Sequence, residues 1–473
     1  MGYPILTVQE MRDWEASSWE AGLNPRDVIQ RAGSLIAKAI LERTRPNDRV
    51  LLVAGPGNNG NDARACALQL TDRDTLLIDV TDPELGLSQL RQALDMPFSL
   101  LLDGVFGIGL NRNLEGPWRQ IIELLNLFRC QRIALDCPSG LDADTGRARG
   151  ACFEADETWT LGAPKAGLIA EKAPPFTGRI RVFSDLGLIG RPVASSPLLW
   201  MADTDFGRFP SPRNVDGHTG SVGHAAVVAG SSGYHGSAVL ATYGALRARP
   251  GLTSCIVQPE ILAVVAAQLA APMVRAWTAN LRLPETTTSL LLGPGLAATE
   301  LSIALRDWSL RLWNDFEAPL IFDASSLAWL PKRVPISRYC RVITPHPGEA
   351  ASLLGCKSEQ VQADRLTALR LLSRQLGNVW VILKGYQTLI GRSEGPVWIN
   401  STGNIGLAQG GTGDVLAGFL GGLLAQPRLA SIPERTLPYA VWEHGAAADR
   451  LERRTRNWTS EDLAEEIGSG RSD

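Results

Sequence analysis

The strongest constraint on the fold of this chain is a pattern that occurs twice: short apolar runs, each followed by a glycine-rich loop or an amphipathic segment. In the first half, the apolar runs lie at residues 49–54, 76–80, 100–103, 132–136 and 157–161. Helical spacing is found at 7–21, at 25–43 and, after the first run, at 62–70. Such alternation is typical of βαβ units around a parallel sheet. The first half is therefore predicted to be an α/β domain.

The same pattern returns in the second half of the chain. Strands are expected at 223–229, 252–257, 289–292, 320–323, 341–344 and 379–383, and helices at 237–247, 260–269, 362–376, 437–451 and after Gly413. Between the halves, residues 187–217 are rich in Gly, Pro and Ser, which indicates a linker. Because a domain commonly has roughly 100–200 residues, we predict two doubly wound, three-layer α/β domains, at residues 1–205 and 206–473.

Composition narrows the range of partners. The chain has 46 Lys and Arg residues against 49 Asp and Glu residues, with a net charge of −3. This balance has no electrostatic signature for nucleic acid or for an anionic membrane, so small-molecule partners are expected. The seven cysteines form no CxxC pair, which indicates reduced thiols. The first twenty residues lack the pattern of a signal peptide, and a cytoplasmic location is predicted.

Three strands of the first half are followed by polar, glycine-containing loops. GPGNNGND follows residue 54, DGVFGIGLNR begins at residue 103, and DCPSGLDAD begins at residue 136. Each loop by itself is compatible with ordinary turns and helix caps. Ligands of an open parallel sheet bind beyond the carboxyl ends of its strands, so the three loops together favour a binding site. Their oxygen atoms suit sugar hydroxyls and a hard cation.

In the second half, the segment GNIGLAQGGTGD leads directly into an apolar helical stretch. Glycines before a helix leave its first N–H groups free to face an anion, and the helix dipole adds to the attraction. Such a site can stabilise a phosphoryl group during transfer, while Asp414 can act as a base toward a hydroxyl. The alternative is a flexible linker in which Asp414 only complements the helix dipole. Lys384 stands at a strand end, where it can meet a nucleotide phosphate.

The motifs of the first half, together with LGAPKAGL at residues 161–168, resemble those of the NAD(P)H-hydrate epimerases over most of residues 1–190. The resemblance implies a Rossmann-like fold, a bound K+ held by Asn59, Asp103 and Ser139, and isomerase activity. Because epimerisation requires a hydroxyl to leave and return, Asp136 is the expected catalytic acid and base. The substrate-binding residues that it implies are Asn58, Asn59, Gly60, Asn61, Asp62, Gly107, Ile108, Gly109, Leu110, Asn111, Arg112 and Asn113.

The segments AGSSGYHG, LGPG, TPHPGE, LKGYQT and GGTGDVLAG resemble ADP-dependent NAD(P)H-hydrate dehydratases, which have a ribokinase-like fold, over residues 215–470. The resemblance implies a lyase in which ADP, with Mg2+, phosphorylates the hydrate and loss of phosphate restores NAD(P)H, leaving AMP. Asp414 would be catalytic, and the hydrate would contact Ser237, Gly295 and His346. The nucleotide-binding residues would be Lys384, Gly385, Tyr386, Gln387, Thr388 and Gly413.

Both resemblances together imply a bifunctional repair enzyme, expected to be a homo-oligomer, that acts on the hydrates NADHX and NADPHX. The first half would interconvert the R and S hydrates, and the second would dehydrate the S form. Two alternatives stay open: a ribokinase-like kinase of a small hydroxylated substrate, and a nucleotide-binding regulator without turnover. The chain departs from the two families' usual motifs at Asn61, Ala63, Cys137, Thr219, Arg249, Ala297 and Ser325.

Overall fold

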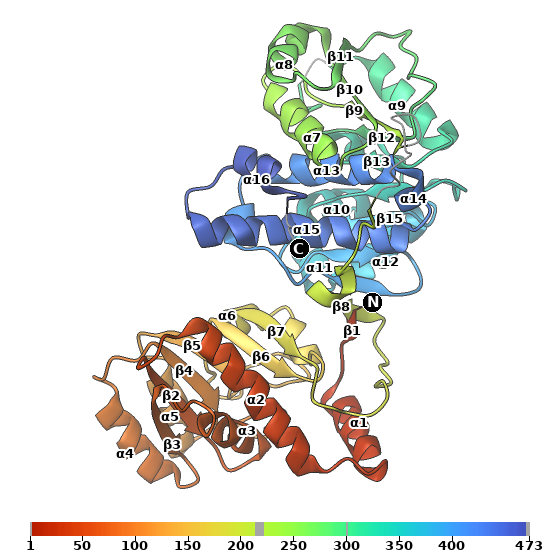
Figure 1. The fold of residues 1–473 in the computed structure, drawn as a ribbon. Coiled ribbons are helices and arrows are strands. Elements are labelled where there is room, and N and C mark those ends of the chain that lie inside the picture. The colour runs from red at the N-terminus through yellow and green to blue at the C-terminus, as the bar shows by residue number, and fades with distance from the viewer. Residues whose placement is uncertain (1, 213–221, 299–300, 470–473) are drawn as a thin grey trace. The chain divides into compact units, whose positions relative to one another are not determined.

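The computed structural model of the chain describes residues 2–212, 222–298 and 301–469 (Figure 1). It divides into two compact units. One contains residues 3–198, and the other contains residues 199–473 together with the first two residues. The division falls within residues 187–217, the segment predicted to be a linker. Thr219, one of the departures from the usual motifs, lies outside the described residues.

The first unit contains one sheet with the strand order β3-β2-β4-β5-β6-β7, in which all neighbours are parallel. Apolar clusters lie on both faces of this sheet, one including Ile36 and Ile40 of helix α2 and the other including Leu90 of α4 and Ile121 of α5. The elements are β1 (Tyr3–Pro4), α1 (Val8–Glu20), α2 (Pro25–Arg43), β2 (Arg49–Ala54), α3 (Asn58–Ala67), β3 (Asp74–Asp79), α4 (Pro83–Ala93), β4 (Leu100–Gly104), α5 (Gly116–Leu125), β5 (Gln131–Leu135), β6 (Glu157–Leu161), η1 (Ala166–Ile169), α6 (Pro174–Thr177) and β7 (Arg179–Phe183).

Strand order locates the binding edge of this unit. From β2 the chain passes to β3 on one side, and then to β4 on the other side of β2. The loops after β2 and β4 therefore diverge at a topological switch point, where open α/β sheets bind their ligands. The two loops predicted to bind the substrate are the loops at this point.

The second unit has a sheet with the order β8-β17-β16-β15-β14-β13-β12-β9-β10-β11. Strands β9 to β15 run parallel, whereas β16 and β17 form an antiparallel edge that sequence analysis does not anticipate. Its strands are β8 (Leu198–Trp200), β9 (His224–Val228), β10 (Leu252–Val257), β11 (Met273–Ala276), β12 (Ser289–Leu292), β13 (Leu320–Phe322), β14 (Arg341–Ile343), β15 (Trp380–Leu383), β16 (Leu389–Gly391) and β17 (Val397–Ile399).

Helices lie on both faces of this sheet, which confirms the doubly wound, three-layer expectation (Figure 1). They are η2 (Asp203–Phe206), α7 (His235–Arg247), η4 (Pro259–Ile261), α8 (Leu262–Gln268), α9 (Ile303–Asp315), η5 (Ala324–Trp329), α10 (Pro347–Leu354), α11 (Ser358–Ala363), α12 (Arg365–Gln375), η6 (Ile405–Leu407), α13 (Thr412–Leu424), α14 (Pro427–Ala430), α15 (Pro433–Arg454) and α16 (Ser460–Glu466).

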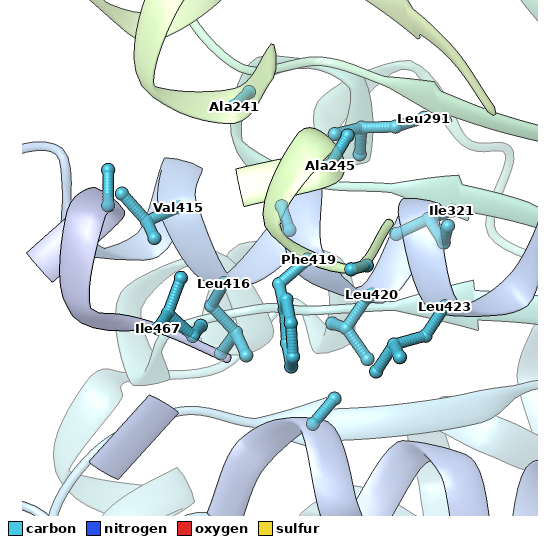
Figure 2. Packing of buried hydrophobic residues seen from close by; sticks show 14 of the residues in the cluster. Ala241, Ala245, Leu291, Ile321, Val415, Leu416, Phe419, Leu420, Leu423 and Ile467 are labelled. Atoms are coloured by element: carbon cyan, nitrogen blue, oxygen red, sulfur yellow. The ribbon is translucent and has the colours of Figure 1, made fainter. Parts of the chain in front are cut away.

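Helices α7 and α13 pack unusually closely. A Cβ on Gly418 would lie 1.8 Å from the carbonyl oxygen of Ala241, and one on Gly422 would lie 2.3 Å from that of Ala245. Figure 2 shows Phe419 in the apolar cluster that these helices share with the sheet. Because glycine lacks a side chain, the two backbones can approach. This packing aligns the first turns of both helices, where predicted site residues lie.

Two helices differ from the predicted boundaries. The helix expected from residue 62 begins at Asn58, because Gly60 packs against the backbone of Gly55, where a Cβ would lie 1.9 Å from a carbonyl oxygen. The helix expected over 362–376 corresponds to α12, which begins at Arg365, while a separate helix, α11, ends at Ala363. Asp364 separates the two with φ of −145° and caps α12, its Oδ1 accepting a hydrogen bond from the N–H of Thr367.

Candidate active sites

Three loops of the first unit meet at the carboxyl edge of its sheet. Asn59, in the first turn of α3, donates from Nδ2 to the carbonyl oxygens of Phe106 and Leu135, at 3.0 Å each. A Cβ on Gly107 would lie 3.4 Å from Cγ of Asn59 and 3.4 Å from Oδ2 of Asp136. Residues predicted from three separate motifs, Asn59, Gly107 and Asp136, therefore surround one point.

Asp136 is held firmly in a backbone conformation that few residues adopt. Its φ is 64°, in the left-handed region that Asp tolerates better than most residues. Its Oδ1 accepts hydrogen bonds from Nζ of Lys165 and, at 3.1 Å, from the N–H of Leu161. Lys165 is 1% exposed and also donates to Oγ1 of Thr160 at 3.1 Å. Oδ1 is thus bound by the protein, while Oδ2 faces Gly107.

Lys165, the buried partner of Asp136, is absent from the predicted site residues, although it lies within LGAPKAGL. The sequence feature that could have identified Lys165 is its position as the single charged residue of an otherwise apolar segment, residues 161–168. Burying an unpaired ammonium group is very costly, so such a lysine requires a partner, and Asp136 is that partner.

Two further carboxyl groups lie near this ion pair. Burial, together with the charges of Asp136 and Glu15, raises the pKa of Asp62 well above its usual range. Burial and the charge of Asp136 also raise the pKa of Glu15. The charge of Lys165 opposes both shifts. The site therefore disfavours a charge on Asp62, while Lys165 is the ion-pair partner of Asp136.

The predicted cation ligands share one buried polar cluster. Oδ2 of Asp103 accepts from the N–H of Ser139 at 2.8 Å, and Oδ1 accepts from Oγ of Ser139 at 2.7 Å. The carbonyl oxygen of Phe106 accepts from Nδ2 of Asn59 at 3.0 Å and from Oγ of Ser139 at 3.3 Å. Burial raises the pKa of Asp103 to about 6.

Oδ1 of Asn59 is buried and has no hydrogen-bond partner among the described residues. An orphaned amide oxygen of this kind is unfavourable unless a ligand satisfies it. In the described ranges no group of three or more His, Cys, Asp or Glu side chains could hold a metal. A cation here would therefore rely on amide and hydroxyl oxygens with the single carboxylate of Asp103. This donor set fits a hard cation of low charge.

The remaining predicted residues of the first unit differ in their surroundings. Asn58, Gly60, Asn61 and Asp62 form the first turn of α3, and Oδ1 of Asn61 accepts from Nη1 of Arg64 at 3.2 Å. Ile108 and Leu110 pack against apolar clusters. The others lie exposed on the loop after β4: Gly109, Asn111, Arg112 and Asn113.

In the second unit, Asp414 lies in the first turn of α13 and forms a side-chain hydrogen bond with Ser237 in the first turn of α7. A Cβ on Gly295 would lie 2.6 Å from Cβ of Ser237, so Gly295 adjoins this pair. Gly411, which caps α13, has φ of 92°, in the region that favours glycine. Three predicted residues, Asp414, Ser237 and Gly295, thus converge at two helix N-termini.

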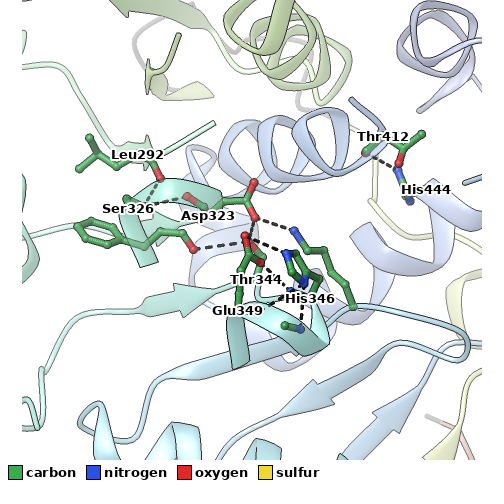
Figure 3. A network of polar contacts seen from close by, with 11 residues as sticks. Leu292, Asp323, Ser326, Thr344, His346, Glu349, Thr412 and His444 are labelled. Carbon is green, nitrogen blue, oxygen red and sulfur yellow. Dashed lines mark hydrogen bonds and ion pairs between the residues drawn. The ribbon is translucent and has the colours of Figure 1, made fainter. Parts of the chain in front are cut away.

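Asp323 is the second residue that the predicted site set lacks. It follows β13, is 1% exposed, and its Oδ1 accepts from Nζ of Lys384 at 2.9 Å and from Oγ1 of Thr344 at 2.5 Å (Figure 3). Its position at the carboxyl end of a strand, like that of Asp103, is the sequence signal that could have identified it. A Cβ on Gly413 would lie 3.5 Å from Nζ of Lys384.

The charges at this site are coupled. Burial and the charge of Asp323 raise the pKa of Asp414 to about 7, against the opposing effects of Ser237 and Lys384. Burial acts to lower the pKa of Lys384, but the nearby charges of Asp323, Glu349 and Asp414 raise it overall. Lys384 is therefore a permanent cation, while Asp414 can exchange a proton near neutral pH.

Two histidines have different positions. His346 caps α10, where its Nδ1 accepts from the N–H of Gly348 at 3.0 Å, and its side chain is 57% exposed. It therefore belongs to the rim of the site. His444 on α15 is buried, and its Nε2 donates to the carbonyl oxygen of Thr412 at 2.9 Å (Figure 3). Burial lowers the pKa of His444 to about 4, so the neutral ring steadies the first turn of α13.

Residues 384–388, which we call the nucleotide loop, connect β15 to β16. The N–H of Lys384 donates to the carbonyl oxygen of Pro345 at 2.9 Å. Oγ1 of Thr388 donates to the carbonyl oxygen of Gly385 at 3.0 Å. Tyr386 is 56% exposed, and Gln387 has a positive φ of 53°. The loop thus begins with Lys384, at the same sheet edge as Asp323.

Several departures from the usual motifs are accommodated. A Cβ on Gly104 would lie 2.7 Å from Cβ of Ala63, so the glycine makes room for the alanine. Cys137 is buried. The N–H of Ala297 donates to Oγ of Ser231 at 3.2 Å. Ser325 lies in η5, two residues after Asp323, which precedes this helix as its N-cap.

Comparison with known proteins matches each half of the chain to a protein family. The NAD(P)H-hydrate dehydratase family matches residues 225–469, and the family described as YjeF-related protein N-terminus matches residues 25–96 and 77–167. The bifunctional NAD(P)H-hydrate repair enzyme Nnr of Coxiella burnetii is 31% identical over 93% of this chain and 93% of its own length. That of Escherichia coli K12 is 33% identical over 93% of this chain and 88% of its own length.

Solved structures resemble the second unit. A ribokinase-like superfamily protein from Enterococcus faecalis V583 is 22% identical, with a TM-score of 0.50, and covers 59% of this chain and 97% of its own. This likeness confirms the ribokinase-like fold. The ADP/ATP-dependent NAD(P)H-hydrate dehydratase of Bacillus subtilis, crystallised with ATP and Mg2+, is 29% identical, with a TM-score of 0.49, over 55% of this chain and 92% of its own. No helix in the described ranges is long and apolar enough to cross a membrane.

Proposed function

The chain belongs to the family of bifunctional NAD(P)H-hydrate repair enzymes, and we propose that its two activities reside at two separate sites. Residues 1–205 form the epimerase, centred on Asp136, and residues 206–473 form the dehydratase, centred on Asp414. Two observations support this division: each compact unit has its own cluster of buried charged groups, and each cluster lies at the carboxyl edge of its own sheet.

In the epimerase, the C–O bond of the hydrate breaks as a proton is delivered to the departing hydroxyl, and water then adds to either face of the ring. We assign this proton exchange to Oδ2 of Asp136, because Oδ1 is already bound by Lys165. Asp62, whose pKa is raised, holds a second proton within the site. K+ bound by Asn59, Asp103 and Ser139 would supply positive charge toward the anionic substrate.

In the dehydratase, Asp414 removes the proton of the hydrate hydroxyl as its oxygen attacks the terminal phosphoryl group of ADP or ATP. The departing nucleotide is AMP or ADP. The C–O bond then breaks with release of inorganic phosphate, and the neighbouring ring carbon loses a proton, which restores NAD(P)H. Lys384 and the first N–H groups of α13 stabilise the phosphoryl charge. Mg2+ would arrive on the nucleotide, whose phosphates supply most of its ligands.

The observation that carries this proposal is the placement of Asp414, with a pKa of about 7, beside Ser237 and Lys384. Phosphorylation is chemically useful here, because phosphate is a far better leaving group than hydroxide. Small-molecule nucleotide substrates suit both sites. A cytoplasmic location and a homo-oligomer remain predictions.

The decisive test incubates the purified chain with mixed R and S hydrates and either ADP or ATP, following the absorbance of the reduced nicotinamide. Full recovery is expected, because epimerisation feeds the R form to the dehydratase. Recovery limited to the S portion would contradict the epimerase assignment. A stable phosphate ester would indicate a small-molecule kinase instead. Nucleotide binding without turnover would indicate a regulator.

A further inference from the structure

One arginine binds the backbone of the nucleotide loop and of the strand end before it. The guanidinium of Arg365, at the start of α12, donates to four backbone carbonyl oxygens. Nη1 lies 2.6 Å from the oxygen of Tyr386 and 3.2 Å from that of Gln387. Nη2 lies 3.0 Å from the oxygen of Leu383 and 3.4 Å from that of Lys384. Among the described residues, no carboxylate forms an ion pair with this guanidinium.

The loop needs such support, because its backbone is strained. Gln387 has φ of 53°, a region that a residue with a long side chain rarely adopts, and Gly385 has φ of 130°. Local strain of this kind persists only where the surroundings over-determine it. Hydrogen bonds from one guanidinium to carbonyl oxygens throughout the loop provide that restraint.

The direction of these hydrogen bonds also orients the N–H groups. In a planar trans peptide, the carbonyl oxygen and the N–H of the next residue point in opposite directions. Carbonyl oxygens of Lys384, Tyr386 and Gln387 point toward Arg365, so the N–H groups of Gly385, Gln387 and Thr388 point away from it. A set of N–H groups turned to one side is an anion-binding arrangement.

We propose that Arg365 is a positioning residue that preforms the nucleotide loop for a nucleoside diphosphate or triphosphate. This inference rests on the proposed function of the second unit. Arg365 does not contact the nucleotide; it holds carbonyl oxygens back so that N–H groups face the phosphates or the base. It also fixes the start of the loop at Lys384, whose ammonium is bound by Asp323.

A lysine could not replace this arginine. The planar guanidinium presents five donors in a rigid fork, whereas an ammonium is a compact charge on a flexible stem. Burial also lowers the pKa of Arg365 to about 10, and at that value the group stays charged at neutral pH. Arg365→Lys therefore keeps the charge but loses the geometry.

The chain contains a matched control. Arg341, at the start of β14, is buried, and its guanidinium likewise donates to backbone carbonyl oxygens: those of Trp313 at 2.7 Å, Ala318 at 2.9 Å and Phe316 at 2.6 Å. Burial lowers its pKa to about 10 as well. It lies at the beginning of its strand, whereas the proposed site lies at the carboxyl ends. Arg341→Lys therefore tests the structural cost of losing such an arginine without touching the nucleotide loop.

The experiment compares Arg365→Lys, Arg365→Gln and Arg341→Lys with the wild-type chain. Measured quantities are kcat and KM for ADP and ATP, KM for the S hydrate, the epimerase rate and Tm. For both Arg365 variants we expect the nucleotide KM to rise about tenfold or more, with the hydrate KM and epimerase rate unchanged. Arg341→Lys should lower Tm and leave the nucleotide KM unchanged.

An unchanged nucleotide KM in both Arg365 variants, with only Tm lowered, would overturn the inference. So would an equal rise in the KM for the nucleotide and for the hydrate. If the wild-type chain shows no nucleotide-dependent dehydration, the proposed function itself fails. In that case the Kd of ADP and ATP is measured by calorimetry instead of KM. A Kd raised about tenfold in both Arg365 variants, but not in Arg341→Lys, would support the role of Arg365, and an unchanged Kd would overturn it.

Discussion

Nζ of Lys384 lies 2.9 Å from Oδ1 of Asp323, at the ends of two different strands of one sheet. The same ammonium also favours the ionised form of Asp414, whereas the charge of Asp323 opposes it. Burial and the charge of Asp323 outweigh Lys384 and leave Asp414 with a pKa of about 7. A carboxyl group so balanced can act as a base near neutral pH.

Dehydration should depend on the protonation of Asp414. Because a base must be deprotonated, kcat/KM is expected to rise with pH and reach half of its maximum near pH 7. Ser237→Ala removes a hydrogen bond that lowers the pKa, so the midpoint should move to higher pH. Asp323→Asn removes a charge that raises the pKa, so the midpoint should move to lower pH. Midpoints that stay constant in both variants would contradict the assignment of the base.

The raised pKa of Asp414 also affects the free energy of unfolding, which should fall with rising pH where the dehydratase activity rises. The folded pKa of Asp414 lies above the value of roughly 3.9 in an unfolded chain. Between these values the folded state binds more protons, so the contribution of this group to the free energy of unfolding falls as pH rises from about 4 to about 7. In Asp414→Asn this part of the pH dependence of Tm should disappear.

Asp414→Asn should separate the two activities. Loss of a general base commonly reduces the rate by a factor on the order of 100 to 10,000. We therefore expect nucleotide-dependent recovery of reduced nicotinamide to be lost, while exchange between the R and S hydrates, followed by chromatography, continues at the wild-type rate. Loss of both activities in a folded variant would contradict two independent sites.

Lys165→Met should affect only the first unit. It leaves the buried carboxyl group of Asp136 without its partner, and breaking a buried ion pair in this way commonly costs about 3–5 kcal/mol of unfolding free energy. Epimerisation should also be lost, while dehydration of the S hydrate continues. The double variant Lys165→Met with Asp136→Asn should recover part of the stability but not the epimerisation. Equal stability of the single and double variants would argue against the pairing.

K+ should support epimerisation in a pH-dependent manner. Replacing K+ by tetramethylammonium, which is too large for the cluster, should lower the epimerase rate about tenfold, and restoring K+ should reverse this. Because the pKa of Asp103 is about 6, the K+ concentration for half activation should increase as pH falls below 6. Asp103→Asn should abolish this dependence. An epimerase rate that is indifferent to the cation would refute the K+ site.

Gly418→Ala should destabilise the second unit. The added Cβ would lie 1.8 Å from the carbonyl oxygen of Ala241, so α7 and α13 must separate, at a cost of about 1–3 kcal/mol. Gly421→Ala, in the same helix, meets its nearest atom at 3.6 Å and serves as the control. Denaturant unfolding of both variants measures the difference. Equal stabilities would show that the close helix packing is not needed.

Much of the candidate site could be predicted from local sequence. The loop after β2, the loop after β4 and the glycines before α13 are recognised because turns, strand ends and helix starts each depend on a few neighbouring residues. Asp136 ends one of the strands recognised in this way, Asp414 follows the glycines before α13, and each lies within a cluster of buried charges. Asp323 lies at a strand end too, and the same rule could have included it.

Other parts of the site required the tertiary structure. The alternation of strands and helices by itself determined the fold class and placed the polar loops at the carboxyl edges of two sheets. Partnerships such as those of Lys165 with Asp136, Lys384 with Asp323 and Arg365 with the nucleotide loop depend on which strands become neighbours. Strand order and burial are properties of the whole chain, because a buried charge is stable only beside the partner that folding brings to it.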